Sequence, residues 1–245
     1  MKKHLILLAL LLPLYSLAQH TEGRIIFEQK TNMHRSLEDE AMKQYIPEYS
    51  TSKAQLYFKG QESLFTGLEE KEEEPESNEE DGRSMQIRIQ RPVNEVYCNF
   101  ASGKSVELRD FFGKKYLIEK QVEERAWKIT GESKSILGHP CQRAVYEDAE
   151  NERTIEAWFA PSIPCPAGPA TYGKLPGMIL EVNINDGQTI LTAVETDFSA
   201  LENPIEAPTE GKKIKEEKYD QMMEERMREM GGTPGGGATI KIIRG

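Results

Sequence analysis

A proline-rich stretch from Trp158 to Val182 constrains the fold of this chain more than any other feature. It reads W-F-A-P-S-I-P-C-P-A-G-P-A-T-Y-G-K-L-P-G-M-I-L-E-V. Each proline fixes its own φ, lacks an N–H donor, and pushes the residue before it toward extended conformations. The run of prolines between Pro161 and Pro169 therefore excludes a helix and predicts a stiff, extended connector.

The end of the connector predicts a tight turn that leads into a strand. Pro176 and Gly177 fit the two central positions of a type II turn, since proline presets φ and glycine accepts a positive φ. From Met178 to Ile184, apolar residues then alternate with residues of the opposite face. This two-residue period predicts a half-buried β-strand.

A hexapeptide with the character of a family signature closes the connector, and it reads Lys174-Leu175-Pro176-Gly177-Met178-Ile179. It resembles the motif that names the GLPGLI family of secreted Bacteroidetes-type proteins, and the flanks agree from Trp127 to Val194. Lys174 stands where the family has its first glycine, which implies that no positive φ is needed there. Met178 replaces a leucine, a mild change for a core. The resemblance implies a secreted context and no particular chemistry.

Residues 1–18 have the features of a secretory signal peptide. Two lysines precede the apolar run Leu5–Leu14, and Ser16-Leu17-Ala18 supplies the small residues that a signal peptidase recognises. We predict cleavage after Ala18 and a periplasmic or secreted protein. The apolar run is too short for a stable membrane span, although an uncleaved membrane anchor is the alternative interpretation.

Acidic charge narrows the range of partners. Removal of the leader would change the formal net charge from −10 to −12, because Lys2 and Lys3 leave with it. Such a chain is repelled by phosphate backbones, so nucleic acid is not an expected partner. Residues 69–82 hold much of this charge and no apolar residue to bury, which predicts a disordered loop. A cation site there is the alternative, but the glycine-punctuated ligand spacing of calcium loops is missing.

Residues 19–203 predict one mainly β domain, a single antiparallel, strongly curved sheet or open barrel. Short apolar runs are separated by glycine or proline at the spacing of an antiparallel meander. Gly60-Gln61 marks one hairpin, and Asp186-Gly187 marks another with a two-residue turn. Apolar residues at helical spacing predict one short helix over Ser36–Gln44 that packs near the sheet.

Residues 204–245 are expected to follow the β domain as a C-terminal helix, a glycine-rich linker and a terminal strand. The helix is predicted over Lys212–Met230, from an apolar stripe on a highly charged segment. Gly231–Gly237 has the composition of a flexible linker. Thr239–Ile243 has strand character and could add to a sheet edge of its own domain or of a partner.

The three cysteines suggest one disulfide. Disulfides persist in exported proteins, and Cys141 and Cys165 flank the hairpin that leads into the connector. Their bond would close a loop of about 25 residues and stabilise the fold by ~3 kcal/mol. Cys98 would then be a buried free thiol. A reactive thiol at Cys98 is the alternative.

Copper handling is one alternative function. His139-Pro140-Cys141 offers two ligand side chains, and Met223, Met227 and Met230 on the C-terminal helix have the thioethers that suit Cu(I). The other interpretation is that these methionines pack as adaptable filler against an apolar groove. No cofactor is predicted.

Catalytic motifs are missing from the sequence. It contains no G-x-S-x-G elbow, phosphate-binding glycine loop or H-E-x-x-H helix. A catalytic carboxylate pair among Glu156, Glu181 and Glu195, which lie in predicted strands, is the alternative interpretation. The solvent face is the expected place, since alternation puts Glu181 opposite Leu180 and Val182. We therefore predict a non-enzymatic binding or interaction protein. Its ligand would be an apolar or lipid-like molecule on a concave apolar face, or an envelope partner protein.

Overall fold

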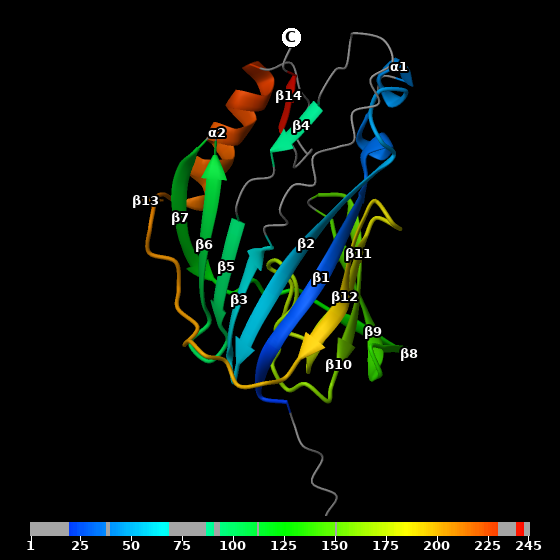
Figure 1. Ribbon diagram of the computed structural model, residues 1–245, viewed down its shortest axis with the longest axis vertical. Helices are drawn as coiled ribbons and strands as arrows, with labels where there is room; N and C mark the ends of the chain where they lie inside the picture. Colours follow the sequence, from blue (N-terminus) through cyan, green and yellow to red (C-terminus); the bar gives the residue numbers. More distant parts are fainter. Residues whose placement is uncertain are drawn as a thin grey trace, which may run out of the picture.

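The computed structural model describes residues 20–37, 40–68, 87–90, 94–111, 113–149, 151–229 and 239–242. Their main sheet is built from β1 (Glu22–Asn32), β2 (Tyr49–Lys59), β3 (Glu62–Gly67), β5 (Asn94–Asn99), β6 (Lys104–Phe111), β7 (Lys114–Gln121), β8 (Lys128–Ile136), β9 (His139–Asp148), β10 (Arg153–Ala160), β11 (Met178–Ile184), β12 (Thr189–Asp197) and β13 (Lys212–Lys213). These twelve strands form one open sheet in the order β13-β7-β6-β5-β3-β2-β1-β12-β11-β10-β9-β8 (Figure 1). Its strand pairs are antiparallel except β13–β7. The prediction of a mainly β fold with one large sheet is confirmed.

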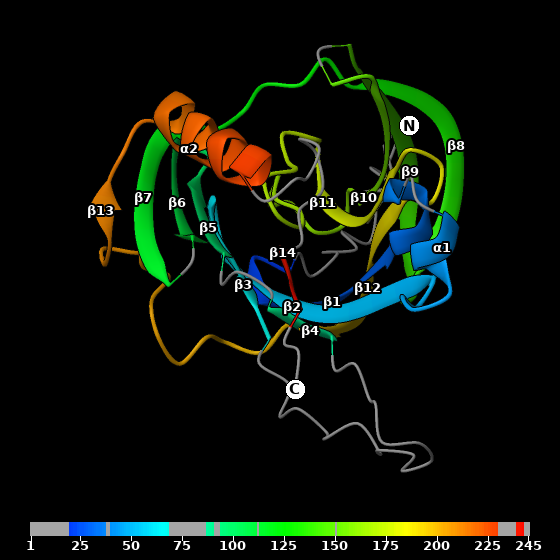
Figure 2. The same cartoon turned by 90° about the horizontal axis from the view of Figure 1, so that it is seen from above.

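The connector, residues 161–177, packs against one face of this sheet. Figure 2 shows the strands along an arc, with the connector on its inner side. The connector side chains Ile163, Cys165 and Leu175 are at most 2% exposed and share one core with Phe27 of β1 and Phe58 of β2. The inner face, which the sequence suggested as a ligand surface, is therefore packed by the chain itself.

Hydrogen bonds to carbonyl groups hold the connector in this position. Prolines cannot donate, but their carbonyl groups still accept, and Lys174 N–H donates to Pro166 O at 2.8 Å. Ile179 N–H at the start of β11 donates to Ala167 O at 2.8 Å. The segment is not helical, as its prolines predict, and it is tied to the strand that follows it.

The turn at Pro176-Gly177 differs from the predicted type II turn. Gly177 N–H donates to Leu175 O at 2.8 Å, a three-residue turn centred on Pro176. The φ of Gly177 is +152°, and a Cβ at this position would lie 2.3 Å from Ala160 O. Glycine is therefore required because the backbone of β10 passes so close, and not because of the turn type.

The expectation that Lys174 needs no positive φ is wrong. Its φ is +66°, in the left-handed region that glycine adopts without penalty. The backbone reverses here so that Lys174 N–H can reach Pro166 O. The side chain also lies on the surface, where Nζ is 2.7 Å from Glu124 Oε1.

One predicted hairpin is confirmed and the other differs in its loop. Gly60 and Gln61 join β2 to β3 as expected. The loop between β11 and β12 has four residues, 185–188, because the last strand pair is Ile184 with Thr189. The predicted two-residue turn at Asp186-Gly187 is therefore wrong, and we call the four-residue loop the rim loop.

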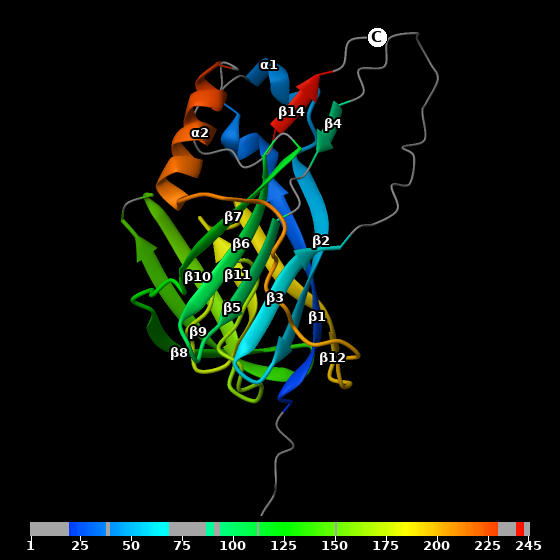
Figure 3. The ribbon, with the colours of Figure 1, turned by 90° about the vertical axis from the view of Figure 1, so that its left-hand side faces the viewer.

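The helical and terminal segments are only partly as expected. The predicted helix Ser36–Gln44 is replaced by a 3₁₀ turn, η1 (Met33–Ser36), and one turn of helix, α1 (Glu40–Lys43), because Leu37 between them is extended. The second helix, α2 (Glu216–Glu229), lies within its predicted range. The terminal strand β14 (Thr239–Ile242) pairs with β4 (Ile87–Gln90) and not with the main sheet (Figure 3).

Three predictions fall outside the described residues. These are the signal peptide at residues 1–18, the acidic loop at residues 69–82 and the glycine-rich linker. Within the described part of the chain, no helix has the length and apolar character that a membrane span requires.

Candidate functional site

The rim loop is a rigid, strained element at one end of the sheet. Asn185 and Asp186 both have a φ of +50°, a conformation that costs energy for residues other than glycine. Side chains hold the loop in place: Gly187 N–H donates to Asn183 Oδ1 at 2.7 Å, and Thr154 N–H donates to Asn185 Oδ1 at 3.1 Å. The loop therefore presents the Asp186 side chain from a fixed backbone.

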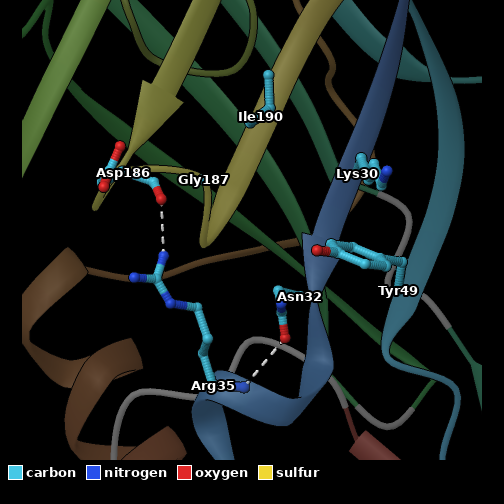
Figure 4. A pocket seen from close by; sticks show the side chains of 7 residues that line it. All are labelled: Lys30, Asn32, Arg35, Tyr49, Asp186, Gly187 and Ile190. Atoms are coloured by element: carbon cyan, nitrogen blue, oxygen red, sulfur yellow. Dashed lines mark hydrogen bonds between the residues drawn. The ribbon is translucent and has the colours of Figure 1, made fainter.

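A cleft of about 320 Å³ opens on one side of the rim loop (Figure 4). It is lined by residues from β1, η1, β2 and β12 as well as the loop, namely Lys30, Asn32, Arg35, Tyr49, Asp186, Gly187 and Ile190. The Arg35 guanidinium donates to Asn185 O at 2.7 Å and to Asp186 O at 2.9 Å. On the opposite wall, Lys30 Nζ lies 4.2 Å from the centre of the Tyr49 ring. Two cations, an exposed aromatic ring and a carboxylate thus share one small cleft.

A second cleft of about 300 Å³ lies on the other side of the rim loop. Its lining is entirely polar and consists of Arg143, Thr154, Glu156, Asn183, Asn185 and Asp186. Arg143 lies 2.6 Å from the Glu156 carboxylate, which also accepts a hydrogen bond from Trp158 Nε1 at 2.8 Å. Asp186 lines both clefts, so the two form one polar region, the rim site.

Electrostatics keep the Glu156 carboxyl in its ionised form. Burial alone would raise its pKa, but the hydrogen bonds from Arg143 and Trp158 lower the pKa below its ordinary value. An acid catalyst at neutral pH needs the opposite shift. Glu156 is therefore suited to hold a fixed negative charge beside Arg143.

The three strand carboxylates predicted on the solvent face lie there. Glu156 is half-buried among polar groups, Glu181 pairs with Lys134 at 2.7 Å, and Glu195 pairs with Arg24 at 3.4 Å. Alternation along the strands accounts for Glu156 and Glu181, whereas Glu195 has the parity of the buried Leu191 and Ala193 and reaches the surface because the register with β1 shifts beside it.

The predicted metal donors are not brought together. His139 of β9 meets His20 at a ring-centre distance of 6.2 Å, and His20 stacks on Phe198. Met223 of α2 instead packs with a cluster around Tyr116 of β7. The Met227 side chain and Met230 lie outside the described residues. Among the described residues, no group of three or more His, Cys, Asp or Glu side chains is placed to hold a metal ion.

The predicted disulfide between Cys141 and Cys165 is not formed in the structure. Both are buried free thiols, as is Cys98. Cys141 lies on β9 with its sulfur 3.4 Å from His139 O, and it belongs to the same buried core as Cys98 and Cys165. Burial raises the pKa of Cys141 to about 11 and that of Cys165 to about 12. Such thiols are poor nucleophiles at neutral pH.

The hexapeptide has a structural position and lines neither cleft. Leu175, Met178 and Ile179 are at most 2% exposed in the core. Sequence reasoning missed the residues that do line the rim site, above all Lys30, Arg35 and Tyr49. They are ordinary surface residue types, and only the fold brings them to the rim loop from three separate elements.

Comparison with known proteins gives a short match and a shared fold. A family model described as "Protein of unknown function (Porph_ging)" matches residues 145–181, which include the connector and the hexapeptide. No curated protein matches the sequence.

Solved structures of PNGF-II resemble this fold. In the P21 crystal form the TM-score is 0.54 at 15% identity, over 84% of this chain and 33% of that chain. In the C2 form the TM-score is 0.52 at 16% identity, over 82% and 32%. This chain thus spans about a third of the PNGF-II chain. At such identity the likeness is one of fold alone.

Proposed function

We propose that this chain is an exported, non-enzymatic binding protein that receives a polar segment of an envelope partner protein at the rim site. The observation that carries the proposal is the pair of polar clefts that share Asp186 on a clamped loop. Export is supported by the leader-like composition of residues 1–18 and by the resemblance to a secreted family.

A polar partner has more support than an apolar or lipid-like ligand. The strongly curved sheet or open barrel expected from the sequence would offer a concave apolar face. In this chain, however, Ile163, Cys165 and Leu175 of the connector pack against that face. The described clefts instead lie at the rim, and most of the residues that line them are charged or polar.

The side chains of the rim site are suited to recognition. Tyr49 is 44% exposed and presents a ring beside the Lys30 ammonium, an arrangement that contacts both apolar and anionic parts of a partner. Arg35 is held in place by two carbonyl groups, so little further ordering is needed on binding. In the second cleft, the paired Arg143 and Glu156 offer charged hydrogen-bonding groups to a partner.

Site-specific photocrosslinking in native envelopes tests this function. A photoreactive phenylalanine analogue at Tyr49 should form a discrete adduct with one partner, and R35A should abolish it by removing a wall of the cleft. The same analogue at Val194 of β12, which is similarly exposed at 42%, is the matched control and should form none. Equal adducts at both positions, or adducts that survive R35A, would contradict the proposal.

Copper handling stays the second candidate because the fold places two histidines side by side. His20 and His139 have ring centres 6.2 Å apart, and burial together with the charge of His20 lowers the pKa of His139, which favours the neutral imidazole that metals bind. Titration of the mature protein with Cu(I) tests it. Binding no tighter than that of a bulk-thiol control, or equal in H20A/H139A, would remove this candidate.

A further inference from the structure

A buried carboxylate lies under α2, on the same side of the sheet as the connector core. Glu107 of β6 is 2% exposed, and it pairs in register with Ile118 of β7, whose side chain packs with α2. Two neighbouring cations compensate its charge. Arg109 lies 2.6 Å from Glu107 Oε2, and Lys120 lies 2.8 Å from Oε1.

The helix α2 covers these cations with its own carboxylates. Figures 1 and 2 show α2 beside β6 and β7. Glu216 Oε1 lies 2.5 Å from Lys120 and 3.2 Å from Arg109, and Asp220 Oδ1 lies 3.6 Å from Arg109. Tyr219, between them in sequence, is 5% exposed, and its ring centre lies 5.2 Å from the Arg109 guanidinium.

The described side chains of α2 bury little apolar surface, so the ionic contacts matter for holding the helix on the sheet. Tyr219 is the only fully buried side chain in the described part of the helix, and Met222 and Met223 are half-buried beside it. A helix with so little apolar contact area gains little from the hydrophobic effect. Partly desolvated ion pairs to Arg109 and Lys120 supply the remaining attraction.

The charges on β6 and β7 beneath α2 indicate which kind of side chain can bind there. Glu107, Arg109 and Lys120 together carry one net positive charge when α2 is not counted. Without α2, Arg109 and Lys120 would share the single carboxylate of Glu107. The surface is therefore complementary to an added carboxylate that is followed, along a helix, by an aromatic side chain.

We propose that α2 is a releasable cover over an acceptor surface, formed by Arg109, Tyr116, Ile118 and Lys120, for an acidic amphipathic helix of a partner protein. The partner helix carries carboxylates one turn apart on either side of a tyrosine, as Glu216, Tyr219 and Asp220 do in α2. It replaces α2 and makes the same ion pairs. This surface is separate from the rim site and does not depend on the function proposed there.

A labelled peptide of residues 214–230 is the probe for the acceptor surface. The full mature chain carrying E216Q/D220N should bind the peptide at least tenfold more tightly than wild type, because its own α2 has lost the competing carboxylates. The matched control is E217Q/E225Q, which removes the same charge from exposed positions of the same helix and should bind as wild type does. Equal binding by both variants, or by neither, would overturn the proposal.

Salt dependence of amide exchange in the unmodified protein gives a second test, independent of any variant. Raising NaCl from about 20 to 500 mM should speed exchange in residues 216–229 several-fold while β6 and β7 are unchanged, because screening weakens the partly exposed ion pairs first. Exchange in α2 that is insensitive to salt would contradict a releasable cover.

Discussion

Individual residues of the connector are explained by what lies next to their backbone. Gly177 is required because Ala160 O leaves no room for a Cβ. Lys174, by contrast, adopts a φ of +66° without any such crowding to exclude its side chain. Glycine at position 177 is thus explained by packing, whereas Lys174 retains backbone strain that glycine would remove.

Replacing Lys174 by glycine should therefore stabilise the protein. The left-handed backbone of Lys174 costs a lysine energy that it does not cost glycine, so K174G should gain about 0.5–1 kcal/mol in free energy of unfolding. Its exposed pair with Glu124 contributes little to set against that gain. Urea denaturation followed by circular dichroism measures the difference.

The control for this prediction is K174A. It removes the same ion pair but keeps a Cβ in the left-handed conformation, so it should be no more stable than wild type. If K174G and K174A have equal stability, the backbone at residue 174 is not strained as described.

At the scale of elements, α2 is held on β6 and β7 by one ionic cluster. Its members are Glu107, Arg109, Lys120 and Glu216. Burial raises the pKa of Glu107, but the charges of Arg109 and Lys120 outweigh it and hold the pKa below its ordinary value of 4.5. The ionised carboxylate therefore stabilises the folded state. Its contribution is fully present above the unfolded pKa and is lost as the pH falls through the folded pKa.

E107Q should lower the free energy of unfolding at neutral pH by about 3 kcal/mol, since it leaves two partly buried cations with one fewer partner. The difference between wild type and E107Q should begin to shrink as the pH falls below the ordinary pKa of about 4.5 and should be lost as the pH falls through the lowered pKa of the folded carboxylate. Urea denaturation at a series of pH values checks both expectations. E119Q, which changes an exposed carboxylate of β7, is the control, and a pH-independent difference for E107Q would contradict the account.

In the molecule as a whole, local sequence patterns predict many of the strands and α2, but the rim site depends on contacts between residues far apart in the sequence. The mainly β character, the Gly60-Gln61 hairpin and α2 follow from periodicity and turn residues close together in sequence. The rim site does not, because Lys30, Arg35 and Asp186 come from elements that only sheet order brings together.

Two predictions from the sequence, the Cys141–Cys165 disulfide and the open concave face, differ from the structure because they depended on long-range packing. The predicted partner of Cys165 was Cys141, a choice based on flanking positions along the chain. The connector turns inward and places Cys165 in the core that also holds Cys98 and Cys141, where all three are free thiols. The open concave face was expected because nothing in the local pattern of Pro161–Pro169 tells which way the connector folds.

Thiol accessibility tests most directly whether the connector fills the inner face of the sheet. In the native protein, prepared without reductant, Cys98, Cys141 and Cys165 should all resist a water-soluble thiol reagent over minutes, and all three should react once urea unfolds the chain. Rapid native labelling of Cys98 or Cys165 would mean that the inner face is open, and fewer than three reactive thiols after unfolding would mean that a disulfide joins two of them.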